Sequence, residues 1–207
     1  MERFRPGLPP TALVASGGPV VVYVGRLDPR KGVAHRVDAM PDLARRVPGV
    51  RLVVVGDGPL RPALERRARR VAPECVRFAG AVPPSELPGC YAAADAVCCP
   101  ATHNESFGIV ILEAMACARP VVATDIPGYR VLMRDGQNGR VVTPGHPEAL
   151  SAALADVLNA RELAQRMGAS GRQTALEYGW KLIGERLERC YEEAIAARSG
   201  SARDQRF

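Results

Sequence analysis

The 207-residue sequence is poor in aromatic side chains and lacks the long apolar runs of a membrane protein. No apolar run approaches the roughly 20 residues that a membrane-spanning helix needs. The opening residues, MERFRPGLPP, contain no hydrophobic stretch of the kind found in secretory signals. These absences predict a cytoplasmic protein with one sizeable globular core.

Several metal- and nucleotide-binding motifs are absent as well. The six cysteines, at positions 75, 90, 98, 99, 117 and 190, have no zinc-ligand spacing, and several lie in apolar runs. We therefore expect small buried thiols and no metal site. The sequence contains no GxxxxGK[ST] P-loop, and no GxGxxG follows its first predicted strand, which argues against a Rossmann dehydrogenase.

Positive charge is in excess, with a formal net charge of +6, and much of it lies in the segment RPALERRARR (61–70). Apolar residues in and around this segment share one face of a predicted helix, which leaves the arginines around the rest. A solvated helix face explains the pattern, and contact with an anionic surface at the inner face of a membrane is the alternative. No aromatic stacking signature accompanies the charge, so nucleic acid is not a predicted partner.

Short β-branched runs alternate with longer helical patterns from residue 20 onward. The predicted strands cover residues 20–25, 51–56, 76–80, 95–100, 120–124 and 139–143. The predicted helices cover residues 33–47, 61–70, 84–94, 107–117, 147–159, 161–178 and about 180–197. Pro41 interrupts the first helix, and Pro88 and Gly89 weaken the third. The alternation predicts a single Rossmann-like domain, a doubly wound, mostly parallel six-stranded sheet with helices on both faces.

Ligands of such sheets bind at the carboxyl ends of the strands, so the loops that follow the strands are the candidate site. Gly25, Arg26, Arg30 and Lys31 follow the first strand, where the glycine permits close backbone approach and the cations suit a diphosphate. Gly58 lies in a second glycine turn, at the same edge of the sheet. Taken alone, each loop is also explained as a solvated turn.

The segment after the fourth strand carries two carboxylates. Glu105 precedes the helix predicted at 107–117, whose first-turn amides at 106–109 would form an anion site. Glu113 lies within that apolar helix, where a charge without a partner is costly. The spacing E-x₇-E predicts both carboxylates on one helix face, within reach of one elongated ligand that carries hydroxyl groups. A cap-like acid at the helix start is the other explanation of Glu105.

Four motifs in this order, VGRLDPRKG, VVVGDGP, ESFGIVILEAMACARPVVATDIPG and DGQNG, resemble the large family of retaining GT-B glycosyltransferases. The resemblance covers residues 1–195. The wording NESFGIVILEAMA and the R-KG loop are most similar to the actinobacterial GDP-mannose-dependent phosphatidylinositol mannosyltransferases. The resemblance implies the C-terminal half of a GT-B fold, which binds a nucleotide sugar.

The resemblance also implies roles for the candidate residues. Arg26 and Lys31 would act on the donor diphosphate and Glu105 on the hydroxyls of the donor sugar, as the catalytic groups. Glu113 would bind the ribose hydroxyls. The other donor-binding positions implied are Gly25, Arg30, Gly58, Val82, Ser106, Phe107, Gly108 and Ile109. No metal or other cofactor is implied, because protein cations and the helix terminus would supply the positive charge.

The family's organisation implies how the chain is divided. Residues 1–19 resemble the remnant of an interdomain connector, residues 20–178 the nucleotide-sugar-binding domain, and residues 179–198 a helix that crosses to an N-terminal acceptor domain. That acceptor domain is the missing partner, and without it we expect exposed apolar surface on the helix and self-association through it. Residues 199–207 are predicted to be a disordered tail.

The leading prediction is therefore the donor domain of a hexosyltransferase, inactive by itself, with a GDP-, UDP- or ADP-hexose as donor and mannose from GDP-mannose as the narrower expectation. Two other functions remain open. One is a non-catalytic module that binds a nucleotide sugar, and the other is an enzyme similar to the nucleotide-sugar 2-epimerases. The E-x₇-E segment with an upstream R-KG loop fits the transferases better.

Overall fold

Six short strands form one sheet in the computed structural model, which describes residues 2–14 and 17–204. The strands are β1 (Val20–Val24), β2 (Arg51–Val55), β3 (Val76–Gly80), β4 (Ala96–Cys99), β5 (Val121–Thr124) and β6 (Arg140–Val142). Their order is β3-β2-β1-β4-β5-β6, and each neighbouring pair is parallel. This confirms the predicted doubly wound sheet.

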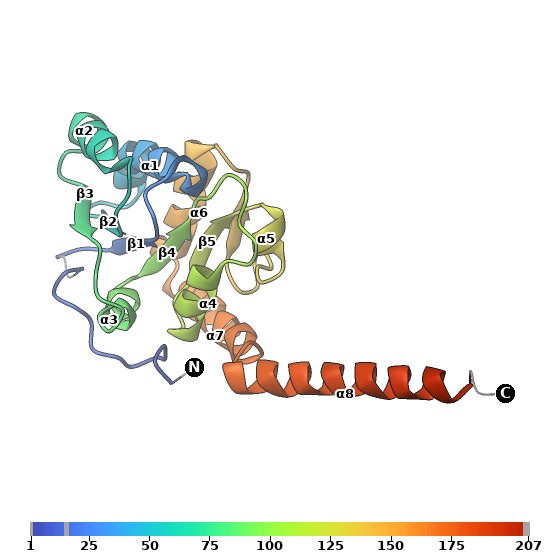
Figure 1. The fold of residues 1–207 in the computed structure, drawn as a ribbon. Helices are drawn as coiled ribbons and strands as arrows, with labels where there is room; N and C mark the ends of the chain where they lie inside the picture. The colour runs from blue at the N-terminus through green and yellow to red at the C-terminus, as the bar shows by residue number, and fades with distance from the viewer. Residues whose placement is uncertain (1, 15–16, 205–207) are drawn as a thin grey trace.

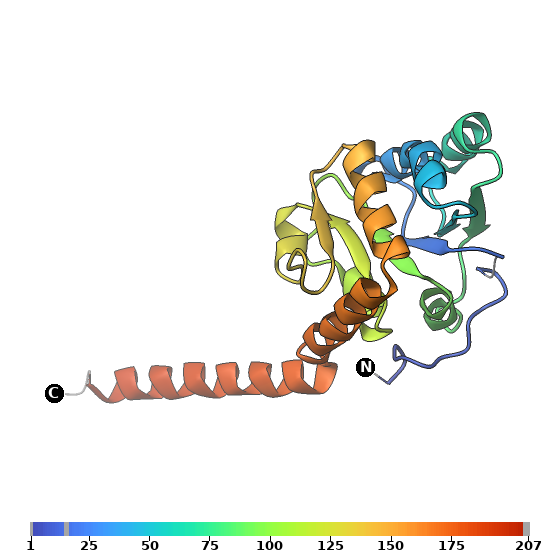
Figure 2. The same ribbon diagram turned by 180° about the vertical axis from the view of Figure 1, so that it is seen from behind.

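Helices cover both faces of the sheet, with a buried apolar cluster under each face. They are η1 (Pro29–Lys31), α1 (Val33–Arg46), α2 (Arg61–Val71), α3 (Leu87–Ala92), α4 (Ile109–Ala116), α5 (Pro127–Arg130), α6 (Pro147–Asn159), α7 (Arg161–Leu176) and α8 (Trp180–Asp204). Figures 1 and 2 show α1, α2 and α6 on one side, and α3, α4 and α7 on the other. Because both faces are covered, β1, β4 and β5 are apolar on both sides and almost wholly buried.

The prolines flagged in the sequence are accommodated in two ways. Pro41 lies inside α1, and the helix continues past it to Arg46. Burial of the apolar face of α1 outweighs the backbone hydrogen bond that a proline removes. Pro88 lies in the first turn of α3, which begins later than predicted, at Leu87. A proline there loses no helical hydrogen bond, since first-turn amides have no partner within the helix.

The last helix, α8, projects away from the sheet and its covering helices (Figures 1 and 2). It continues to Asp204, whereas the sequence predicted a disordered tail from residue 199. The helix runs on through Ser199, Gly200 and Ser201 although these are weak helix formers, because an established helix gains one hydrogen bond for each residue added. Residues 205–207 of the predicted tail lie outside the described residues. Across the described ranges, every helix is too short or too polar to span a bilayer.

Candidate functional site

The loops that follow β1 and β4 meet at the carboxyl edge of the sheet. These strands are neighbours in the sheet but distant in sequence, and the strand order reverses between them, which is where doubly wound sheets bind ligands. The amide of Thr102 donates a hydrogen bond to the carbonyl of Arg30 at 2.8 Å. Gly32 adopts a left-handed conformation with φ of 64°, and a Cβ there would lie 1.9 Å from the carbonyl oxygen of Pro100. Only glycine therefore permits this approach.

An ion pair joins the two loops. Lys31 Nζ lies 2.7 Å from Glu105 Oε1, and the two side chains are 21% and 12% exposed. A pair that is this well shielded from water is screened far less than a surface pair. The sequence predicted both residues as members of one site, and the structure brings them into direct contact.

The other cations of the first loop differ in how they are held. Asp28 accepts hydrogen bonds from the Arg30 amide at 3.0 Å and from Arg30 Nη2 at 3.2 Å, which ties Arg30 to its own loop. Burial acts to raise the pKa of Asp28, but the hydrogen bonds and charge from Arg30, with the Lys31 amide, outweigh it and lower the pKa. Arg26 is exposed and forms no ion pair within residues 2–14 and 17–204, so it is free to meet a ligand.

The glycine turn after β2 packs against the first loop. The amide of Leu27 donates to the carbonyl of Asp57 at 2.9 Å, and the amide of Leu60 donates to the carbonyl of Leu27 at 3.1 Å. Gly58 and Gly25 both lie in these packed turns at the carboxyl edge. These glycines let the two backbones approach each other. Because glycine has no side chain, any contact of Gly25 or Gly58 with a ligand would be through the backbone.

The helix after Glu105 begins later than predicted. Gly108 is left-handed, with φ of 84°, and caps α4, whose first residue is Ile109. Glu105 therefore lies in the preceding loop, and the expectation of two carboxylates on one helix face is wrong. The amides at 106–109 accordingly belong to a loop and a cap rather than to a first helical turn, and none donates to a backbone acceptor in the described residues.

Two apolar side chains near this cap differ in their surroundings: one is packed and the other is exposed. The ring of Phe107 packs edge-on against Tyr178, with centroids 5.4 Å apart, so it anchors the loop to the end of α7. Ile109 is 65% exposed, and Ser106 beside them is exposed too. Within the segment 106–109, the side chains of Ser106 and Ile109 are therefore the ones that are exposed to a ligand.

Glu113 lies on α4, the helix that follows the loop of Glu105, and its contacts differ from those of the ion pair. Its Oε2 accepts a hydrogen bond from the Tyr91 hydroxyl at 2.8 Å. Burial raises the pKa of Glu113, and the Tyr91 hydrogen bond and the charge of Arg3 partly oppose that rise. Val82, in the loop after β3, packs partly against the apolar cluster beneath α3 and α4. The backbone carbonyl of Pro84, two residues further on, accepts a hydrogen bond from Arg3.

Sequence reasoning missed three tyrosines that underlie the site. Tyr91 holds Glu113, and Tyr23 donates to the carbonyl of Arg26 at 2.9 Å. Tyr129 lies against Gly108. Burial raises the pKa of Tyr23 and of Tyr129, with nearby Cys99 adding to the rise, so both hydroxyls stay protonated. The only signal in the sequence was a hydroxyl-bearing ring within otherwise apolar runs, which does not reveal its partner.

The cysteines are distributed mostly as expected. Cys90, Cys98, Cys99 and Cys117 are buried, whereas Cys75 is half-buried and Cys190 is exposed on α8, against the prediction of burial. Residue 190 lies on a helix that projects from the body, so there is no core for it to enter. In the described part of the chain, no three His, Cys, Asp or Glu side chains gather in the manner of a metal site.

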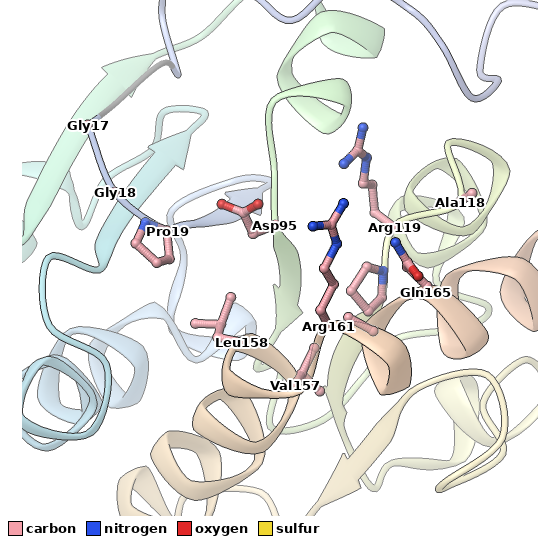
Figure 3. A pocket seen from close by; sticks show the side chains of 12 residues that line it. Gly17, Gly18, Pro19, Asp95, Ala118, Arg119, Val157, Leu158, Arg161 and Gln165 are labelled. Carbon is pink, nitrogen blue, oxygen red and sulfur yellow. The ribbon is translucent and has the colours of Figure 1, made fainter.

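A hollow of about 710 Å³ lies at the opposite edge of the sheet, where the strands begin (Figure 3). Its polar lining includes Asp95, Arg119 and Arg161. Asp95 accepts a hydrogen bond from the Val20 amide at 2.7 Å, and Arg119 donates to the Ala94 carbonyl at 3.0 Å, so both side chains tie strand ends together. The hollow contains none of the candidate residues, and we place the site at the carboxyl edge.

The fold and the charged loops at its switch point define a Rossmann-like α/β domain with a candidate ligand site at the carboxyl edge of the sheet. Comparison with known proteins gives the family: the description "Glycosyl transferases group 1" matches residues 9–174, so the chain belongs to this family. The resemblance to GT-B glycosyltransferases is thereby confirmed.

Two relatives carry the narrower resemblance. The phosphatidyl-myo-inositol mannosyltransferase of Mycobacterium tuberculosis is 39% identical over 180 residues, which cover 84% of this chain and 47% of that protein. The GDP-mannose-dependent alpha-(1-6)-phosphatidylinositol monomannoside mannosyltransferase of Mycolicibacterium smegmatis is 40% identical over 177 residues, which cover 82% of this chain and 46% of that protein. The chain spans about half the length of the curated relatives it matches.

Two solved structures show the same fold. The sucrose-phosphate synthase of Thermosynechococcus elongatus superposes with a TM-score of 0.82 at 28% identity, over 95% of this chain and 51% of that one. The Anabaena protein HepE, solved in complex with UDP, superposes with a TM-score of 0.74 at 27% identity, over 86% of this chain and 48% of that one.

Proposed function

We propose that this chain is the donor-binding domain of a retaining hexosyltransferase, which takes its sugar from a nucleotide sugar. The observation that carries the proposal is the ion pair of Lys31 and Glu105 at 2.7 Å. It places a cation suited to phosphate and a carboxylate suited to sugar hydroxyls together at the switch point of the sheet. Membership of the family supports sugar transfer, and the UDP complex of HepE supports a nucleotide ligand.

We propose GDP-mannose as the donor, with UDP- and ADP-hexoses as the competitors. Support comes from the relatives, which are named as mannosyltransferases, one of them GDP-mannose-dependent.

Each part of the site has its own task in this proposal. Lys31 and Arg26 bind the diphosphate, and Lys31 exchanges part of its contact with Glu105 for phosphate oxygens. Glu105 then accepts hydrogen bonds from the sugar hydroxyls, and Glu113 accepts those of the ribose. Amide groups at 106–109 add donors near the phosphates or the sugar. The cations stabilise the charge on the departing diphosphate, so the reaction needs no metal.

Retention of configuration follows if the acceptor oxygen attacks the face of the sugar from which the diphosphate leaves. The bond from the anomeric carbon to the diphosphate breaks, the bond to the acceptor oxygen forms, and the diphosphate takes the acceptor's proton. Glu105 is then a positioning carboxylate for the sugar and forms no covalent bond to it.

The acceptor would be bound by a further domain, since the chain spans about half the length of its relatives. A cytoplasmic location at the inner face of a membrane fits two observations. The relatives are named for phosphatidylinositol substrates. In addition, α2 exposes Arg66, Arg69 and Arg70, which suit anionic headgroups.

Calorimetric titration with GDP, UDP, ADP and their hexose conjugates tests the proposal. We expect saturable binding of one nucleotide series and its loss in Lys31→Ala. Arg66→Ala, which removes an exposed cation of α2, is the matched control and should bind as the unmodified chain does. Binding that is absent throughout, or that survives Lys31→Ala, would count against a donor site at this edge.

A further inference from the structure

Glu113 is hydrogen-bonded to Tyr91, a side chain that has no role in the proposed function. The Tyr91 hydroxyl, from α3, donates to Glu113 Oε2 at 2.8 Å. Within residues 2–14 and 17–204, this is the only hydrogen bond to the carboxylate, so Oε1 remains available to a ligand. The ring of Tyr91 has no exposed surface at all. A buried tyrosine hydroxyl needs a partner, and here that partner is a candidate ligand-binding group.

The surroundings of Tyr91 leave its ring little freedom to move. Phe4, from the N-terminal segment, packs edge-on against it, with ring centroids 5.9 Å apart and an angle of 71° between the planes. The carbonyl of Phe4 accepts a hydrogen bond from Arg172 Nη1 at 3.1 Å, and the same nitrogen donates to the carbonyl of Ala116 at 2.7 Å. The segment that covers Tyr91 is therefore tied to the helix that carries Glu113.

The titratable groups around Glu113 come from three segments. Tyr91 from α3 and Arg3 from the N-terminal segment act on the carboxylate, and the Cys117 thiol at the end of α4 lies near enough for the charge of Glu113 to raise its pKa. Burial raises the pKa of Glu113, while the Tyr91 hydrogen bond and the Arg3 charge act against that rise. Removing the Tyr91 hydroxyl takes away a donor that favours the ionised form, so it should raise this pKa further.

We propose that Tyr91 is a positioning residue, which orients Glu113 so that its free oxygen accepts hydrogen bonds from the ribose hydroxyls of the nucleotide. The inference rests on the proposed function, because it requires a ribonucleotide at this edge of the sheet. It adds a specificity: the site should distinguish ribonucleotides from their 2′-deoxy analogues, and Tyr91 should be needed for that distinction.

The test compares Tyr91→Phe with the unmodified chain. Whichever of GDP, UDP and ADP binds most tightly is titrated alongside its 2′-deoxy analogue, across a range of pH. We expect the unmodified chain to favour the ribonucleotide by about tenfold, as befits a hydrogen bond to a charged group. In Tyr91→Phe that preference should fall to about threefold or less.

The pH profile separates a positioning role from a merely structural one. Ribonucleotide affinity should weaken as the pH falls through the pKa of Glu113, because the protonated carboxyl is the poorer acceptor. In Tyr91→Phe the weakening should begin at a higher pH, since the pKa of Glu113 is raised further. A loss of packing alone would weaken both nucleotides alike and leave the midpoint in place.

Tyr23→Phe is the matched control, because it removes another buried hydroxyl whose partner is a backbone carbonyl. It should leave the preference for ribose unchanged, whatever it does to overall affinity. If Tyr91→Phe does not fold, Phe4→Ala loosens the same ring and should lower the preference by a smaller factor. Equal preferences and equal midpoints in the variants and the unmodified chain, with both nucleotides bound, overturn this inference alone. Failure of the unmodified chain to bind any nucleotide overturns the proposed function as well.

Discussion

Two ionisable side chains lie against opposite faces of the sheet, and they differ in how well their polar atoms are paired. Glu113, on α4, accepts the Tyr91 hydrogen bond and stays partly exposed at the site. Arg36, on α1, is fully buried, and none of its guanidinium nitrogens has a hydrogen-bond partner in the described residues. A buried charge is tolerated cheaply only when it is paired. Glu113 is thus paired and still accessible to a ligand, whereas we expect the buried Arg36 to lower the stability of the fold.

The largest effect should come from Arg36→Leu. The nearby Cys98 thiol is a weak acceptor and does not serve as a counterion: burial raises the pKa of Cys98, and the charge of Arg36 and its hydrogen bond only partly oppose that. Replacing the unpaired guanidinium by an apolar side chain should stabilise the protein by about 2–4 kcal/mol in urea unfolding. Arg45→Leu, on the exposed face of the same helix, should change stability by less than about 1 kcal/mol. Destabilisation by Arg36→Leu would show that the guanidinium has a partner after all.

Glu113→Ala should act in the opposite direction. It leaves the Tyr91 hydroxyl buried without an acceptor, which should cost about 1–3 kcal/mol of stability in the same unfolding assay. Nucleotide affinity should fall by about tenfold, as expected for a lost charged hydrogen bond. Glu74→Ala, an exposed carboxylate with the same change of net charge, controls for both measurements. If Glu113→Ala stabilised the protein as Arg36→Leu should, the contrast between the two faces would collapse.

Glu105→Ala should separate the sugar from the nucleotide. The variant frees Lys31 from its ion pair, so the free nucleoside diphosphate should bind within about threefold of the unmodified chain, or more tightly. The hexose conjugate should lose about tenfold in affinity, because its hydroxyls lose their acceptor. Calorimetry with both ligands decides the matter, and the exposed carboxylate of Glu74 again provides the control, as Glu74→Ala. Equal losses for the two ligands would contradict the assignment of Glu105 to the sugar.

The sheet could be predicted because its signals are local. Each buried strand is a β-branched run, and the helices between them are long enough to show a period, so the number and the winding of the strands follow from the sequence. The short α5 escaped prediction, since four residues beginning with Pro127 and Gly128 resemble a turn. The hydrophobic pattern of the sequence also could not predict that α8 would have no core to pack against.

The site was predictable only in outline. Lys31 and Glu105 could be placed together because the carboxyl ends of neighbouring parallel strands meet at one edge. The predicted placement of Glu105 and Glu113 on one helix face was wrong because the left-handed Gly108 delays the start of the helix. The sequence Phe107-Gly108 does not by itself predict that conformation. The hydrogen bond from Tyr91 to Glu113 joins two different helices. The poor pairing of the Arg36 guanidinium depends on which side chains surround it in the folded structure. Neither the Tyr91–Glu113 hydrogen bond nor the surroundings of Arg36 can be inferred from the spacing of residues in the sequence.

The same contrast between partnered and unpartnered groups extends to the apolar side chains of α8. Trp180, Leu187, Tyr191 and Ile195 are 54% to 85% exposed and recur at helical spacing along one face. Exposed apolar stripes of this kind favour association, so we expect the chain to self-associate weakly through α8 in analytical ultracentrifugation. Leu187→Glu should weaken that association by roughly tenfold, because it places a charge in the middle of the stripe. Arg189→Glu, on the opposite face of the helix, should not. A strict monomer at high concentration would mean that this stripe needs a different partner.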